Sequence, residues 1–304
     1  MVPVKSKEEA KVKKRVSVLS VSSCVVLCIY SLLMLMMLVW AIIFSLTDYT
    51  NDIFFSETGS YLVMPKNLYF KNYADAIKLY TCEVEYGLGT RVLTYLDLLF
   101  NSLVFAVGRS FFGALAPCIM GYAASQFRFK FNGFLDGFVI VAMILPIVGA
   151  LPSQIELLNS LGLMDSYFGL FIMSFSFLNM YYLIFKGTFG GMSKGYSEAA
   201  LLDGASNLTI FLKIMLPLAR TVFFTIFILN FVSNWNTYTT VMVFAPNIPT
   251  ISYVFYIKTR VNTHAGDETT RMASAMILMI PILIFYIFTN KLIMGNLTVG
   301  GLKG

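Results

Sequence analysis

The sequence predicts an all-α integral membrane protein whose chain crosses the membrane as six helices. Of its 304 residues, 58% are hydrophobic and only 12% are charged, whereas soluble domains average about 25% charged residues. Apolar runs long enough for a membrane span recur along the whole sequence, with polar segments between them. The basic residues lie between the apolar runs and form no single patch, which argues against nucleic-acid binding despite the net charge of +6.

The first apolar run follows a basic N-terminal segment, residues 1–17, and covers residues 18–46. The run is longer than the apolar region of a signal peptide, which has about 7–15 residues, and no small-residue cleavage site follows it. Trp40 near its far end is typical of an anchor at the membrane interface. We therefore expect a first transmembrane helix that begins in the cytoplasm.

Five further apolar runs complete the predicted bundle, at residues 101–124, 134–151, 167–185, 217–244 and 272–294. Pro146 lies inside the third of the six spans and predicts a kink or a local break, because proline lacks the backbone N–H. Together the spans form one transmembrane domain, residues 18–294, followed by a tail at 295–304.

Three polar segments are expected on the outer face, at residues 47–97, 152–166 and 245–271. The first is the longest, and its mixed charge and many Tyr and Asn residues favour an ordered segment. Within it, residues 67–77 have the composition of a short helix.

The distribution of basic residues predicts the orientation. Six spans place both termini on one side, and the segments on that side carry 14 Lys and Arg residues, against 7 on the opposite side. Cytoplasmic segments are enriched in Lys and Arg. We therefore expect both termini, and the loop at residues 186–217, in the cytoplasm.

One stretch of that loop, Glu198 to Pro217, is the most informative part of the sequence. Ala199–Leu202 favour a helix, Gly204 permits a sharp change of chain direction, and Asn207–Met215 have the composition of a second short helix. Pro217 is expected at the start of the following helix, where its missing N–H costs little. The stretch predicts a compact knob between two spans.

This stretch resembles the EAA loop of ABC-importer permease subunits. The matching residues are Glu198, Ala199, Ala200, Gly204, Ile214, Leu216 and Pro217. Motifs outside the loop resemble the maltose-importer type of carbohydrate ABC permease, in particular its subunit with six spans and a short N-terminus. These motifs are Asn101-Ser102-Leu103, Gly121-Tyr122-Ala123, Leu161-Gly162-Leu163 with Asp165-Ser166, Trp235-Asn236 and the tail from Gly300 to Gly304.

The resemblance, which covers nearly everything from Asn67 to Gly304, implies a type I ABC importer permease fold. The chain would be one membrane-spanning subunit of an ATP-driven importer for sugars or oligosaccharides, in the cytoplasmic membrane of a bacterium or archaeon. It would form half of the translocation path with a second, homologous permease subunit. Two copies of a cytoplasmic ABC ATPase and an extracytoplasmic solute-binding protein would complete the assembly.

The resemblance also implies roles for individual residues. The residues expected to couple to the ATPase are Glu198, Ala199, Ala200, Asp203, Gly204, Ala205, Ile214, Leu216 and Pro217. Glu198 would face the ATPase, and Gly204 would allow the bend of the coupling helix. This chain would bind no metal and no cofactor and would not be an enzyme, because ATP and Mg²⁺ would be used by the partner ATPase.

Arg109 departs from the expected pattern, since it lies roughly two turns into the predicted second span. A guanidinium inside a span costs about 2.5–3.5 kcal/mol on insertion scales, so it should face the bundle interior or water. Two interpretations remain open. Arg109 lines the translocation path and contacts an acidic or heavily hydroxylated sugar, or it snorkels or pairs with an acidic residue of the partner permease.

A polar row in the fifth span is similarly ambiguous. Asn230, Asn234 and Tyr238 recur every four residues and share one helical face, next to Trp235. Amides and aromatic rings suit a sugar, so these four residues are candidates for the substrate path. A helix-packing face held by amide hydrogen bonds has the same pattern.

Two other classes of function compete with the ABC permease. An ion-coupled secondary transporter normally needs carboxylates inside the membrane, but the 16 acidic residues fall in loops or near span ends, with Asp136 and Glu156 nearest to a span interior. A membrane enzyme is disfavoured because no catalytic or phosphate-binding motif is present, and the energy would therefore come from a separate subunit. An ABC permease for a non-sugar solute remains an alternative.

Overall fold

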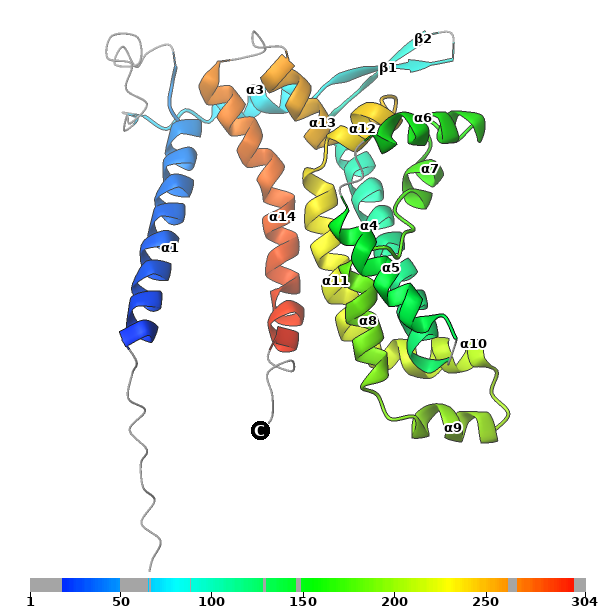
Figure 1. The fold of residues 1–304 in the computed structure, drawn as a ribbon. Coiled ribbons are helices and arrows are strands. Elements are labelled where there is room, and N and C mark those ends of the chain that lie inside the picture. Colours follow the sequence, from blue (N-terminus) through cyan, green and yellow to red (C-terminus); the bar gives the residue numbers. More distant parts are fainter. Residues whose placement is uncertain are drawn as a thin grey trace, which may run out of the picture. The chain divides into compact units, whose positions relative to one another are not determined.

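The structure, a computed structural model, is predominantly helical (Figure 1). It describes residues 18–49, 65, 67–87, 89–127, 130–145, 149–261 and 267–297. The chain divides into two compact units, Met1–Tyr69 and Phe70–Gly304. The predictions for residues 1–17, for Pro146 and for Gly300–Gly304 lie outside the described residues.

The first unit contains helix α1 (Val18–Ser45), which covers the first predicted span. Its 28 residues extend about 42 Å at 1.5 Å per residue, more than the roughly 30 Å of a bilayer core. At its end the Ser45 hydroxyl donates to the carbonyl of Ile42, and the Thr47 hydroxyl donates to Ile43. The Ile43 carbonyl also accepts from the N–H of Leu46, so these hydroxyls add to the hydrogen bonds at the end of the helix.

Three long helices dominate the second unit: α4 (Tyr95–Gln126), α11 (Leu216–Asn236) and α14 (Glu268–Leu297). In the described part of the chain, four helical segments are long and apolar enough to cross a membrane. These segments are 21–45, 95–126, 207–236 and 268–290. They correspond to the first, second, fifth and sixth predicted spans.

The third and fourth predicted spans take a different form. Helix α5 (Asn132–Ile144) has 13 residues and ends shortly before Pro146. Helices usually end at or before the residue that precedes a proline, because the proline ring disfavours a helical conformation of that residue. The fourth is divided into α7 (Tyr167–Ile172) and α8 (Met180–Gly190). Asn179 starts α8 as its N-cap, because its side-chain oxygen accepts from the N–H of Tyr181.

Helix α4 makes its most extensive contacts with α8 and α11. Gly121 allows the close approach of α4 to α8, since a Cβ at this position would lie 2.6 Å from the Cβ of Phe185 and 2.8 Å from the backbone N of Lys186. Helix α5 is held to α8 by polar groups. The Asp136 carboxylate accepts from the Tyr182 hydroxyl at 2.9 Å and from the Lys186 ammonium.

The segments predicted on the outer face contain short elements. The first has α3 (Lys71–Leu79) and an antiparallel hairpin of β1 (Cys82–Tyr86) and β2 (Gly89–Leu93), in which Val84 lies opposite Arg91. The helix agrees with the prediction for residues 67–77, shifted by a few positions. The hairpin was not predicted. The second of these segments contains most of α6 (Ala150–Ser160), and the third contains α13 (Ile251–Tyr256) and a π-helix η2 (Ile257–Val261). The end of the predicted fifth span forms a separate helix, α12 (Thr239–Phe244).

Several of the sequence motifs connect α4 with the segments predicted on the outer face. The Asn101 amide donates to the carbonyl of Pro249 at 3.1 Å and accepts from the Tyr167 hydroxyl at 2.7 Å. The Asp165 carboxylate accepts from the backbone N–H of Asn247 at 2.8 Å, and Asp165 itself has a positive φ of 51°. These bonds connect α4, the start of α7 and the segment before α13.

The Gly121 contact gives a stability prediction. Gly121→Ala forces α4 and α8 apart, which we expect to cost about 1–3 kcal/mol, the usual cost of overpacking. The measurement is thermal unfolding of the purified protein in detergent. Gly137→Ala is the matched control in α5, because a Cβ there meets no atom within 4 Å. Equal melting temperatures for the two variants would contradict the predicted close packing.

Candidate functional site

The loop between α8 and α11 is built on a short helix, α9 (Gly195–Leu202), that ends in a tight turn. The N–H of Gly204 donates to the carbonyl of Leu201 at 3.0 Å, and the N–H of Ala205 donates to Ala200 at 2.9 Å. This pair of bonds is a Schellman motif. Gly204 has a φ of 79°, a left-handed conformation that costs glycine little. The chain therefore changes direction at Gly204.

A second helical segment follows the turn and continues without interruption into α11. Ser206 caps α10 (Asn207–Ile210) by accepting from the N–H of Thr209 at 3.2 Å. The π-helix η1 (Phe211–Met215) continues directly into α11. Pro217 lies in the first turn of α11, as predicted, although η1 leads into this helix without a gap. The wider π-turn before it accommodates a residue without an N–H.

Aromatic packing fixes this loop to the membrane helices. Ala200, Phe211 and Met215 belong to one buried cluster with residues of α4 and α8. The Tyr122 ring of α4 lies at its centre, 4.8 Å from the Phe211 ring and 5.4 Å from the Phe189 ring of α8, measured between centroids. Ala205, Ile214 and Leu216 pack against the edge of the same cluster. We call the region from Gly195 to Met215 the knob.

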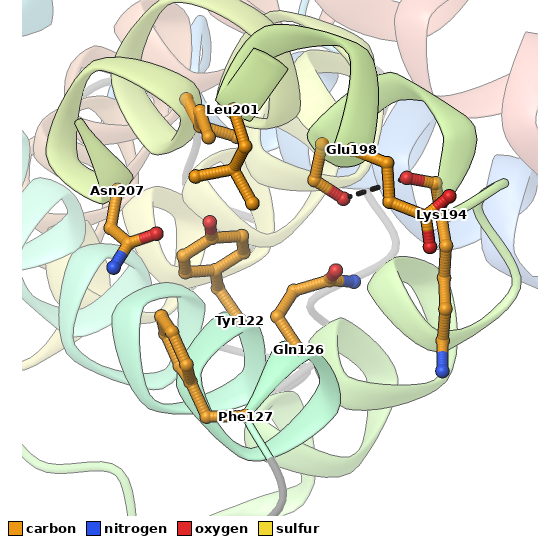
Figure 2. A pocket seen from close by; sticks show the side chains of 9 residues that line it. Tyr122, Gln126, Phe127, Lys194, Glu198, Leu201 and Asn207 are labelled. Atoms are coloured by element: carbon orange, nitrogen blue, oxygen red, sulfur yellow. Dashed lines mark hydrogen bonds between the residues drawn. The ribbon is translucent and has the colours of Figure 1, made fainter. Parts of the chain in front are cut away.

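A pocket of about 180 Å³ lies between the knob and the end of α4 (Figure 2). Figure 2 shows the Tyr122 ring pointing towards Leu201, with Gln126 and Phe127 on the same side. Glu198 lines the pocket and is exposed. It lies in the first turn of α9, where a carboxylate is favoured by the positive end of the helix dipole. The remaining lining residues are Lys194, Ser197, Asn207 and Ile210.

Several apolar side chains of the knob are exposed. Leu202 is 90% exposed and Leu208 is 67% exposed. Tyr196, Leu201 and Leu212 are also exposed, as are Ala199, Asp203 and Pro217. Contiguous exposed apolar surface is typical of sites that contact another protein or the membrane. The described residues contain no group of three or more His, Cys, Asp or Glu that could hold a metal.

The polar residues expected on the substrate path lie elsewhere, within the span bundle. Arg109 is about four turns from the start of α4, deeper than the two turns expected, because α4 begins at Tyr95. Its Nε donates to the Ser174 hydroxyl at 2.6 Å, and its guanidinium carbon lies 5.3 Å from the centroid of the Phe105 ring. Ser174 lies between α7 and α8.

The structure separates the four candidates of the fifth span. Asn234 donates its amide to the Ser110 hydroxyl at 3.1 Å, and Trp235 is buried and donates to the carbonyl of Leu278 at 3.2 Å. The Tyr238 ring stacks on Tyr256, with centroids 4.0 Å apart. The amide nitrogen of Asn230 is buried, and it has no hydrogen-bond partner in the part of the chain that the structure describes.

With the knob and the bundle described, the comparison with known proteins decides the family. The family model of the binding-protein-dependent transport system inner membrane component matches residues 113–295, which include the knob. The chain belongs to this family. The resemblance found in the sequence is therefore confirmed, and this inner membrane component is a multi-pass transport protein.

Individual relatives agree with this assignment. The permease is 23% identical over 210 residues to the arabinooligosaccharides transport system permease protein AraQ of Bacillus subtilis (strain 168), covering 69% of this chain and 74% of AraQ. It is 27% identical over 198 residues to the sn-glycerol-3-phosphate transport system permease protein UgpE of Escherichia coli (strain K12), covering 65% and 69%.

A solved structure shows the same fold. A chain of a bacterial ABC transporter involved in the import of the acidic polysaccharide alginate superposes with a TM-score of 0.66 and 22% sequence identity, over 95% of this permease and 99% of that chain. The predicted helical permease fold is confirmed by this likeness and by the family.

Sequence reasoning missed two parts of the site. It did not identify Tyr122, Phe189 and Phe211 as the residues that attach the knob, although their aromatic character inside or beside apolar runs was a usable signal. It also missed Ser174 as the hydrogen-bond partner of Arg109. The signal there was the polar interruption Ser174, Ser176 and Asn179 in the fourth span.

The turn at Gly204 can be tested by its backbone geometry. Gly204→Ala places a Cβ in the left-handed conformation, which we expect to destabilise the turn by about 1–2 kcal/mol without any clash. Hydrogen exchange of the Ala205 amide should become faster. Gly187→Ala in α8 is the control. A Cβ at Gly187 also has no atom within 4 Å, but the φ of Gly187 is not in the left-handed region. Unchanged exchange in Gly204→Ala would refute the strained turn.

Proposed function

We propose that this permease is one membrane subunit of an ATP-driven importer for sugars or oligosaccharides, and that its knob docks on a cytoplasmic ATPase. The observation that carries the proposal is the knob itself. It presents exposed Leu202, Leu208 and Glu198, and it is fixed to α4 and α8 through Tyr122. A surface of this kind suits the transfer of movement from a partner protein to the membrane helices.

The partners follow from the family and from the position of the knob. A second, homologous permease would complete the path, two ABC ATPase copies would contact the two knobs, and an extracytoplasmic solute-binding protein would deliver the solute. Both termini would be cytoplasmic, as the excess of Lys and Arg on their side indicates. ATP and Mg²⁺ would be bound by the ATPase, and this chain would bind no cofactor of its own.

The packing of the knob supports a simple coupling mechanism. Closure of the ATPase pair on ATP would move α9, α10 and η1 as one body, because Ala200, Phe211 and Met215 share a buried cluster with Tyr122. Since η1 continues into α11 without a break, the movement would tilt α11 directly. Access to the path would then alternate between the two membrane faces.

The names of the relatives support a carbohydrate or polyol solute. AraQ is named for arabinooligosaccharides, and the superposed structure belongs to an importer of an acidic polysaccharide. UgpE is named for sn-glycerol-3-phosphate, which keeps a non-sugar solute as a second candidate. An ion-coupled mechanism receives less support, because Asp136 at the α5–α8 contact already accepts from Tyr182 and Lys186.

The ATPase assignment can be tested by reversing the charge on the knob. Glu198→Lys should reduce the amount of ATPase that co-purifies with the permease, or abolish coupled uptake, because a cation replaces the exposed anion at the docking surface. The readouts are the stoichiometry of the purified complex and solute uptake in proteoliposomes with ATP inside.

Glu156→Lys is the matched control, since Glu156 is an exposed glutamate on α6, outside the knob. It should retain the ATPase and coupled uptake, and both variants should keep the melting temperature of the membrane bundle. Transport driven by an ion gradient in the absence of any ATPase would contradict the proposal, as would full coupling in Glu198→Lys.

A further inference from the structure

Three elements bring polar groups together inside the span bundle. Arg109 on α4 donates to Ser174, which lies in the segment between α7 and α8. One turn further along α4, a Cβ on Gly113 would lie 3.5 Å from the Asn230 amide nitrogen and 3.7 Å from the Ser174 carbonyl oxygen. Ser174 and Asn230 therefore flank the same part of α4, where glycine contributes no side chain.

The hydrogen-bonding groups left over in this cluster are donors. Arg109 has five N–H donors and no acceptor, and the described residues include no carboxylate within ion-pair distance of it. Its one hydrogen bond in this part of the chain goes from Nε to the neutral Ser174 hydroxyl. The buried Asn230 amide nitrogen has no acceptor there either. An unmatched guanidinium and an unmatched amide are both costly inside a membrane.

The neighbouring polar residues are already satisfied by the protein. Asn234, one turn after Asn230, donates to Ser110, and Trp235 donates to Leu278. These bonds attach α11 to α4 and α14, which is a packing role. Unlike Asn234 and Trp235, Arg109 and Asn230 have N–H donors without an acceptor among the described residues.

The break in the fourth span is the second independent observation. Residues 173–179 between α7 and α8 are not helical, and the break occurs at the position that contacts Arg109. Non-helical backbone at membrane depth is tolerated where it is buried in protein or lines a water-filled cavity, and broken helices commonly form transporter solute sites.

We propose that Arg109, Asn230 and the Ser174 segment form an oxyanion subsite for the transported solute. The guanidinium pairs with a carboxylate or phosphate oxygen of the solute, and the Asn230 amide donates to a second oxygen. The subsite selects negatively charged solutes, such as acidic sugars or sugar phosphates, over neutral sugars of the same size. It rests on the proposed import function and specifies the solute class for that function.

The test is ligand binding to the complete purified transporter, measured as the shift in its melting temperature. The probes are digalacturonate, which carries carboxylates, and glucose 6-phosphate, which carries a phosphate, with maltose as the neutral probe. We expect at least one anionic probe to raise the melting temperature of the wild type and maltose to have a smaller effect. A response to digalacturonate identifies a carboxylate as the bound group, and a response to glucose 6-phosphate identifies a phosphate.

Substitutions assign the binding to these residues. Arg109→Gln and Asn230→Ala should each weaken binding of the responding anion by about tenfold or more, because each removes a donor to a charged group. Arg109→Lys should recover part of the affinity, since it keeps the charge and loses the planar fork. Asn236→Ala is the control on the same helix, because Asn236 is exposed and donates to Val232 within α11.

The same preparations separate this inference from the import function. Co-purified ATPase and basal ATP hydrolysis report whether the transporter is assembled, and both should be unchanged in the control Asn236→Ala. If the ATPase is absent from the wild-type complex, the import function fails. If the complex is intact, the subsite is overturned by binding of maltose equal to that of the anions, by no anion binding, or by wild-type affinity in both Arg109→Gln and Asn230→Ala.

Discussion

The close packing of α4 against α8 and α11 is the constraint on which the rest of the permease depends. Gly121 removes the side chain that would separate α4 from α8. One residue later, Tyr122 contacts Phe189 of α8 and Phe211 of η1. The same contact therefore joins two spans and the knob. Because close-packed interiors transmit displacement instead of absorbing it, the knob cannot move without moving these helices.

The chain leaves the regular α-helix at two places in the bundle, and each has a different physical reason. Before Pro217 the helix widens into η1, which accommodates the missing N–H while the helix continues. After Ile172 the helix stops, and Asn179 caps a new one. The first departure preserves a stiff connection from the knob into the membrane. The second places a non-helical segment with Ser174 beside Arg109.

The parts of the fold that depend on local chemistry were predictable from the sequence. The turn at Gly204 follows from a glycine after a short helix-forming run, and the long spans follow from apolar length. The hairpin of β1 and β2 is held by distant residues such as Asn247, whose contact composition does not report. The break after Ile172 had a local signal only in the polar residues Ser174, Ser176 and Asn179. Asn230 and Asn234 have the same sequence pattern, and only the position of Ser110 distinguishes them.

The two proposed sites are connected by covalent structure. Arg109 and Tyr122 lie on the same helix, about 20 Å apart along its axis. Asn230 lies on the helical run that starts in the knob at Asn207. Ser174 is carried by the break between α7 and α8, so it need not follow α11 when that helix tilts. Movement of the knob would then change the distance between the Asn230 amide and the Ser174 segment. On the proposed assignments, ATP-driven displacement of the knob would separate the donors that hold the anion, which gives a physical reason for solute release to accompany the conformational change.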